Sequence, residues 1–318
     1  WTDSFSNTAS SWLAVTDTSQ ANGVANSAGA AEFINRMLML AGVQIGIVGN
    51  AVGATSITTW LPGASNYIEL MRVFALAGSK AEIEYFAQGA TDSFAAMEAL
   101  TYKGHLATMF AGVRAANGFA SPATMIDSIR NISSAAFGTE RSISVIQRAS
   151  YEWALALGYI GLVYRDGELQ GDGAHYLQTG NLRTARHLYR ALRPTYGAAR
   201  DDRGSVITGA TRNGVNIVLC KTRAAGETAL SAVGSPGSRF KVYEYGTHQS
   251  FALDGTTPFT LNDVAQTIAL KLASDPGSQK LEIVPFGPLD GSNDGSANGL
   301  YDDLTDGDGI AQGRPLFA

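Results

Sequence analysis

Short apolar runs alternate with longer amphipathic segments along the chain up to residue 196. Strands are expected at residues 43–49, 82–87, 123–129 and 159–164, and helical segments lie between them. Because strands that alternate with helices form βαβ units, this part of the chain predicts an α/β domain built on a parallel sheet.

The helical segments carry apolar residues at helical spacing, and some of them end at glycine. Residues 66–78 place Ile68, Met71 and Ala75 on one face and stop at Gly78, a residue suited to a helix C-terminus. The same periodicity recurs in residues 28–42, 142–158 and 178–192.

The pattern changes after residue 196. Short β-type runs at residues 204–222, 238–246, 267–273 and 280–287 are separated by Gly, Asn, Asp and Pro turns. We therefore expect an α/β domain at residues 1–196, and a small β-rich region at residues 197–318.

Composition narrows the class of partner. The chain has 318 residues, of which 45% are hydrophobic and 16% charged, and its net charge is -5. An acidic globular protein has no basic field for phosphates, so no nucleic-acid partner is expected. The longest apolar runs contain glycines and stop short of the roughly 20 residues that a membrane span needs.

Small residues and one cysteine also bear on the class. The 36 glycines, with abundant Ser, Thr and Ala, suit an extracellular protein, either secreted or virion-associated. The single cysteine, Cys220, excludes an internal disulfide framework and a Cys-rich metal site. Its place in a strand-like run predicts a small apolar residue in a buried strand.

An Asp-Gly-Ala-His sequence at residues 172–175 is the first candidate for chemistry. It lies in the loop after the strand at 159–164, and ligands of open α/β sheets bind beyond the carboxyl ends of the strands. Asp172 there can accept the Nδ1 hydrogen of His175 and leave Nε2 to act as a base. The spacing alone leaves open that Asp172 caps a turn and that His175 is a surface residue.

Two further stretches follow predicted strands. Residues 45–63 contain a glycine-rich turn, where the backbone N–H groups near Gly53 can approach a ligand closely. Residues 83–100 place Gln88 at a strand end, where its side-chain amide can donate to a developing negative charge.

Taken in order, IGIVGNAVGATSITTW, EYFAQGATD and GDGAHY resemble the motif blocks of the SGNH-hydrolase superfamily. Within it, they are most similar to the sialate O-acetylesterase and acetyl xylan esterase-like carbohydrate esterases. The resemblance implies a three-layer α/β/α, flavodoxin-like fold with a parallel sheet, followed by a small β-rich region. It also implies an acetylated carbohydrate as the substrate.

The resemblance further implies a Ser-His-Asp mechanism that requires no metal or other cofactor. His175 takes the proton of a serine, Asp172 orients the imidazole, and the backbone near Gly53 holds the oxyanion together with Gln88. Two aromatic side chains beside the site are expected to contact the sugar, those of Trp60 and Tyr176.

The chain departs from these blocks at several positions. Ala54 replaces the second glycine of a Gly-Gly-Thr turn, and its backbone donor survives unchanged if φ is negative there. The Gln-Gly-Glu-Ser-Asp block keeps Gln88 and Asp92 but has Ala90 and Thr91 between them. Asp172 is then expected to orient the histidine alone.

The largest departure is the serine block. No Gly-Gln-Ser-Asn or Gly-Asp-Ser sequence occurs among the 318 residues, and Ser4 in TDSFSN lacks a preceding apolar strand. We expect the nucleophile on an upstream segment or a separate chain. The alternative is a catalytically inactive carbohydrate-binding or structural module of a surface or phage tail protein.

Overall fold

The computed structural model describes residues 52–128, 140–157, 160–164, 206–223, 229–233, 237, 240–247, 249–284 and 299–302. The chain forms two compact units. The first comprises Trp1–Arg130 and Ser134–Ala199, and the second comprises Asn131–Ser133 and Arg200–Ala318. The sequence-based boundary after residue 196 lies close to this division.

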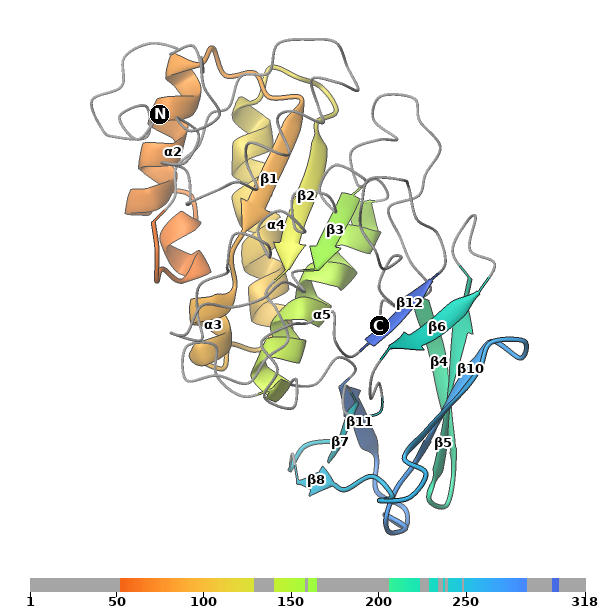
Figure 1. The fold of residues 1–318 in the computed structure, drawn as a ribbon. Coiled ribbons are helices and arrows are strands. Elements are labelled where there is room, and N and C mark those ends of the chain that lie inside the picture. The colour runs from red at the N-terminus through yellow and green to blue at the C-terminus, as the bar shows by residue number, and fades with distance from the viewer. Residues whose placement is uncertain are drawn as a thin grey trace. The chain divides into compact units, whose positions relative to one another are not determined.

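The strands described in the first unit form a parallel sheet. Its strands are β1 (Ile83–Ala87), β2 (Ala123–Ser128) and β3 (Ile160–Tyr164), hydrogen-bonded in the order β1-β2-β3 (Figure 1). Three of the predicted strands are thereby confirmed, while residues 43–49 lie outside the described residues.

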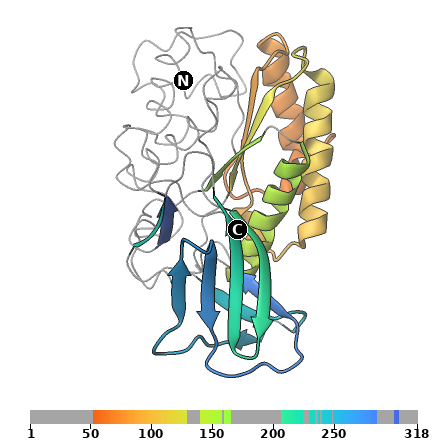
Figure 2. The same ribbon diagram turned by 90° about the vertical axis from the view of Figure 1, so that its right-hand side faces the viewer.

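The described helices of this unit are η3 (Ile57–Trp60), α2 (Ser65–Leu76), α3 (Ala90–Phe94), α4 (Ala99–Ala116) and α5 (Glu140–Leu157). Figure 2 shows α2, α4 and α5 on the same side of the sheet. The α5 helix confirms the prediction at residues 142–158. None of the helices described is both long and apolar enough to cross a bilayer.

A row of aromatic rings joins these helices to the sheet. Trp153 of α5 stacks on Phe110 of α4 at a centroid distance of 4.6 Å. Phe110 meets Phe86 of β1 edge to face at 5.8 Å, and Phe86 meets Trp60 of η3 at 6.2 Å. Because buried aromatic pairs combine large apolar burial with preferred geometry, this row fixes η3 against the sheet.

The α2 helix ends as predicted but buries a different face. Gly78 has a φ of 84°, and the N–H of Ser79 returns to the Phe74 carbonyl at 3.0 Å, which closes the helix. Val73 and Phe74 are buried, whereas Ile68 is 59% exposed. The predicted core face of this helix was therefore wrong, because packing against the rest of the unit selects its orientation.

The second unit is antiparallel, which confirms the β-rich region. Its largest sheet has the order β4-β5-β10-β9, formed by Val206–Asn213, Asn216–Thr222, Thr267–Lys271 and Phe259–Asn262. Three strands form the sheet β11-β7-β8, from Leu281–Val284, Lys241–Glu244 and Ser250–Phe251. Strand β12 (Gly299–Asp302) pairs with β6 (Leu230–Val233).

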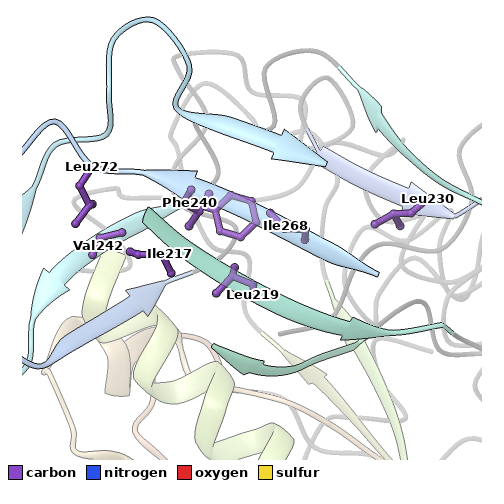
Figure 3. Packing of buried hydrophobic residues seen from close by; sticks show 8 residues of the cluster. Ile217, Leu219, Leu230, Phe240, Val242, Ile268 and Leu272 are labelled. Atoms are coloured by element: carbon purple, nitrogen blue, oxygen red, sulfur yellow. The ribbon is translucent and has the colours of Figure 1, made fainter. Parts of the chain in front are cut away.

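These strands enclose one apolar cluster (Figure 3). Its buried members are Ile217, Leu219, Leu230, Phe240, Val242, Ile268, Leu270 and Leu272. Along β5 the odd-numbered positions face inward, and Cys220 is exposed. The prediction of a strand there is confirmed, but the prediction of a buried cysteine was wrong, because the inward position beside it is taken by Lys221.

Candidate active site

The carboxyl ends of the three parallel strands meet at one edge. Ala87 pairs with Asp127, and Asp127 pairs with Val163, so the strand ends are level. Neighbouring strands are about 4.8 Å apart, which puts the ends of β1 and β3 about 10 Å from each other. Gln88 follows β1 directly, and residues 165–175 follow β3.

Part of the predicted site falls outside the described residues. His175, Asp172 and Tyr176 lie in the segment after β3, and Ser4 lies near the start of the chain. Their roles remain predictions. The structure does describe Gly53, Gln88 and Trp60, and it brings Gln88 into contact with the glycine-rich turn through the hydrogen bonds described below.

The glycine-rich turn has its left-handed residue at an unexpected place. Ala54 has a φ of 57°, so the condition of a negative φ at this position is not met. Gly53 is exposed, has no φ in the left-handed region, and a Cβ added to it would meet no atom within 4 Å. The position that needs glycine by conformation is therefore the one that carries alanine.

Asp92 of α3 binds the residues that follow this turn. Its side chain is fully buried, at 0% exposure. Oδ1 accepts the hydroxyl hydrogen of Ser56 at 2.6 Å, and the N–H of Ile57 donates to Oδ2 at 3.0 Å and to Oδ1 at 3.2 Å. These hydrogen bonds compensate the carboxylate for the water that it loses on burial.

Gln88 binds both the turn and Asp92. Its Nε2 donates to the Thr55 carbonyl at 3.0 Å and to Oδ2 of Asp92, and its Oε1 accepts from the hydroxyl of Tyr102 at 2.8 Å. The reverse amide orientation would set Oε1 against two oxygen atoms. Both amide hydrogens are thus used within the protein, and neither is left for an ester oxygen. In this geometry Gln88 holds the turn instead of donating to substrate.

Tyr102 of α4 is the third member of the hydrogen-bond network that contains Gln88 and Asp92. Burial raises the pKa of its phenol well above the usual value, the charge of Asp92 raises it further, and a hydrogen bond with Ser150 opposes the shift. The phenol therefore stays protonated at ordinary pH and can donate to Gln88. Its position, 14 residues from Gln88, gave no sequence signal for this contact.

Trp60 belongs to the core. Its side chain is 5% exposed, its ring meets Phe86, and its Nε1 donates to the hydroxyl of Thr55 at 3.1 Å. Stacking on a sugar needs an accessible ring face, so the predicted contact with substrate is corrected to a structural one. Within the described segments, no three His, Cys, Asp or Glu side chains gather as metal ligands would.

Comparison with known proteins identifies the class of this α/β protein. Residues 4–193 match the family described as carbohydrate esterase, sialic acid-specific acetylesterase. The match covers more than half of the chain, so the chain belongs to this carbohydrate esterase family. The resemblance to carbohydrate esterases of the SGNH-hydrolase superfamily is thus confirmed.

Two solved structures are similar to the chain. A carbohydrate acetylesterase from Xanthomonas citri is 17% identical with a TM-score of 0.64, over 87% of this chain and 62% of that protein. A protein from Arabidopsis thaliana is 20% identical with a TM-score of 0.42, over 53% of this chain and 67% of that one. The first supports the fold, and the chain spans 62% of its length. No curated protein sequence matches the chain.

Proposed function

We propose that the protein is a serine-type esterase that removes O-acetyl groups from a glycan or polysaccharide. Family membership supplies the reaction class, hydrolysis of carbohydrate esters. The observation that carries the proposal is the glycine-rich turn, which the side chains of Gln88 and Asp92 hold at the carboxyl edge of the sheet. This is the edge where ligands of open α/β sheets bind.

The proposed fold of the first unit is the three-layer α/β/α, flavodoxin-like fold. The consecutive order β1-β2-β3 with α4 and α5 as connections is what one half of such a sheet requires. The predicted strand at residues 43–49 would extend this sheet and lead into the glycine-rich turn.

The proposed reaction proceeds through an acetyl-enzyme. A serine oxygen attacks the ester carbonyl while Nε2 of His175 takes the hydroxyl proton, and Asp172 stabilises the imidazolium. The carbonyl oxygen becomes negative and accepts hydrogen bonds from the backbone N–H groups near Gly53. His175 then gives the proton to the departing sugar oxygen, and water releases acetate in the reverse sequence of steps. Tyr176 is proposed to contact the sugar.

The nucleophile is proposed to come from outside these 318 residues, on an upstream segment or a separate chain. The basis is the missing Gly-Gln-Ser-Asn block: none of the serines among the 318 residues stands in the family's nucleophile motif. An extracellular location, secreted or virion-associated, belongs to the same proposal, since an acetylated polysaccharide is a substrate found outside cells.

The test replaces the proposed base. In a preparation that includes the serine-bearing segment, His175→Ala should lower kcat for acetate release by roughly 10⁴-fold or more, because the serine loses its base. The measurement is acetate release from 4-nitrophenyl acetate and from an acetylated glycan. His105→Ala on α4 serves as the control and should leave the rate unchanged. Equal acetate release by His175→Ala and the wild type would refute the proposal.

A carbohydrate-binding or structural module is the second candidate. The absent serine block favours it, as does the loss of the glutamate between Gln88 and Asp92. Glycan binding without acetate release, both with and without the upstream segment, would support this candidate over the esterase.

A further inference from the structure

Residues 55, 56 and 57 lie at the end of the glycine-rich turn. The side chains of Gln88 and Asp92, which follow β1, hold all three by hydrogen bonds. The side-chain amide of Gln88 donates to the carbonyl of Thr55. The carboxylate of Asp92 accepts from the hydroxyl of Ser56 and the N–H of Ile57. The residues lie 33 to 36 positions apart in the sequence. The turn that carries the proposed oxyanion donors is therefore attached directly to the end of β1.

The turn needs such an attachment because its backbone is strained. Ala54, with a φ of 57°, adopts the left-handed conformation at a cost of roughly 1–2 kcal/mol. A strained residue keeps its conformation only where the surrounding contacts determine it. Here those contacts begin at the very next residue, with the carbonyl of Thr55.

The contacts of Asp92 distinguish between two possible roles. A carboxylate has about four acceptor positions. Oδ1 faces the Ser56 hydroxyl and the Ile57 N–H, while Oδ2 faces the same N–H and the Gln88 amide. With three donors shared between its two oxygens and no exposed surface, the Asp92 carboxylate leaves no open approach for an imidazole. It therefore does not act as the acid that orients His175.

We propose that Asp92 is a positioning residue of the esterase: its carboxylate fixes residues 55–57 and so directs the N–H groups near Gly53 toward the ester oxygen. The proposal rests on the proposed function. Gln88 and Tyr102 act in the same network, since Gln88 joins the carboxylate to the carbonyl of Thr55 and Tyr102 orients the Gln88 amide. Asp92 itself touches neither substrate nor the reacting atoms.

Three variants of the serine-bearing protein test this role. Asp92→Ala removes every acceptor and leaves the Ile57 N–H and the Ser56 hydroxyl without their partner. Asp92→Asn keeps one oxygen for Gln88 and Ile57, while Ser56 can accept from the new amide. Glu84→Ala is the matched control, because Glu84 is also a buried carboxylate but lies near the start of β1, bound to Arg114 and Thr124.

The first readout is kcat per active site, counted by the burst of 4-nitrophenol from 4-nitrophenyl acetate. Asp92→Ala should lower it by about 10²-fold with KM changed little, since a small displacement of donors acts on the transition state. Asp92→Asn should return it to within about 10-fold of wild type with the same acid limb of the pH profile. Glu84→Ala should match wild type per active site.

The second readout is independent of catalysis. Amide hydrogen exchange of residues 53–57 should become at least about 10-fold faster in Asp92→Ala and stay near the wild-type rate in Glu84→Ala. Unchanged exchange in Asp92→Ala, unchanged kcat per active site, or a shifted acid limb in Asp92→Asn would each overturn the positioning role. An inactive wild type would refute the proposed function instead, and the exchange rates would still decide whether Asp92 holds the turn.

Discussion

In the pair Gly53-Ala54, the alanine adopts the left-handed backbone conformation that glycine usually adopts. The backbone of Ala54 is left-handed, while that of Gly53 is not. Glycine at position 53 is therefore not required by conformation or by space inside the protein. Its value is the open approach to its backbone, which fits the proposed contact with an ester oxygen.

Relief of this strain is the first residue-scale prediction. Ala54→Gly should stabilise the first unit by roughly 0.5–1 kcal/mol, the left-handed cost less the extra entropy of an unfolded glycine. Urea unfolding followed by circular dichroism measures the change. Ala96→Gly, at a φ of 54° in the turn after α3, is the control that gives a similar gain away from the glycine-rich turn.

Gly53→Ala completes the comparison. Its free energy of unfolding should stay within about 0.5 kcal/mol of wild type, as the new methyl group meets no protein atom. Loss of stability in Gly53→Ala together with no gain in Ala54→Gly would contradict the φ assignment of the turn.

At the scale of elements, the buried lysine of β5, Lys221, binds the turn between β9 and β10. Lys221 has a side-chain exposure of 0%, and its Nζ lies 2.7 Å from Oδ1 of Asp263 and 3.0 Å from Oε1 of Gln266. Nη2 of Arg223, a more exposed side chain, lies 2.6 Å from Oδ2 of the same carboxylate. The residues between β9 and β10 are thus held by an ion pair that has little contact with water.

Removing the buried cation should be costly. Lys221→Met should destabilise the second unit by about 3–5 kcal/mol, because Asp263 then keeps a partly buried charge without its main partner. Arg223→Met removes a more exposed partner of the same carboxylate and should cost about 1 kcal/mol or less. Equal losses in the two variants, measured by urea unfolding, would show that burial does not govern this pair.

The elements also show where sequence patterns succeed. Short strand-like runs bounded by turn residues predicted β1, β2 and β3, because local sequence preferences are enough to mark a strand there. The face of α2 and the outward position of Cys220 were wrong, since both depend on partners distant in sequence. Asp263 explains why a lysine faces inward at 221, and it lies 42 residues further along the chain.

In the candidate site, too, the sequence indicated individual residues but not their partners. Motif spacing singled out Gln88 and the glycine-rich turn, and the structure joins the two by a hydrogen bond. The spacing did not find what Gln88 binds, since the carbonyl of Thr55 and the hydroxyl of Tyr102 approach only in the folded chain. The sequence therefore proposes these residues, whereas their hydrogen-bond partners are set by contacts that only the folded chain makes.

On the scale of the whole molecule, carboxylates in both units resist protonation. The pKa of Asp254 is lowered from 3.8 to about 2 by hydrogen bonds from the N–H groups of Thr257 and Thr256 and by Lys271. The pKa of Glu69 and of Glu152 is also lowered, by hydrogen bonds from arginine or lysine neighbours. Groups with a lowered pKa contribute stability above their unfolded pKa, and this contribution is lost as pH falls toward the folded value.

Asp254→Asn tests this dependence. The wild type should lose stability between about pH 4 and pH 2, and the difference between wild type and Asp254→Asn should shrink toward zero over the same interval. The amide can still accept from Thr256 and Thr257, so the turn is retained. Urea unfolding at several pH values supplies the measurement, and a difference independent of pH would contradict the lowered pKa.

The outward position of Cys220 gives the molecule two separate optical signals. All four tryptophans, at 1, 12, 60 and 153, fall in the first unit, so tryptophan emission reports on that unit. A maleimide dye can attach only at Cys220, the single thiol, which belongs to the second unit. Emission at two wavelengths would then follow the unfolding of each half of the chain in one cuvette.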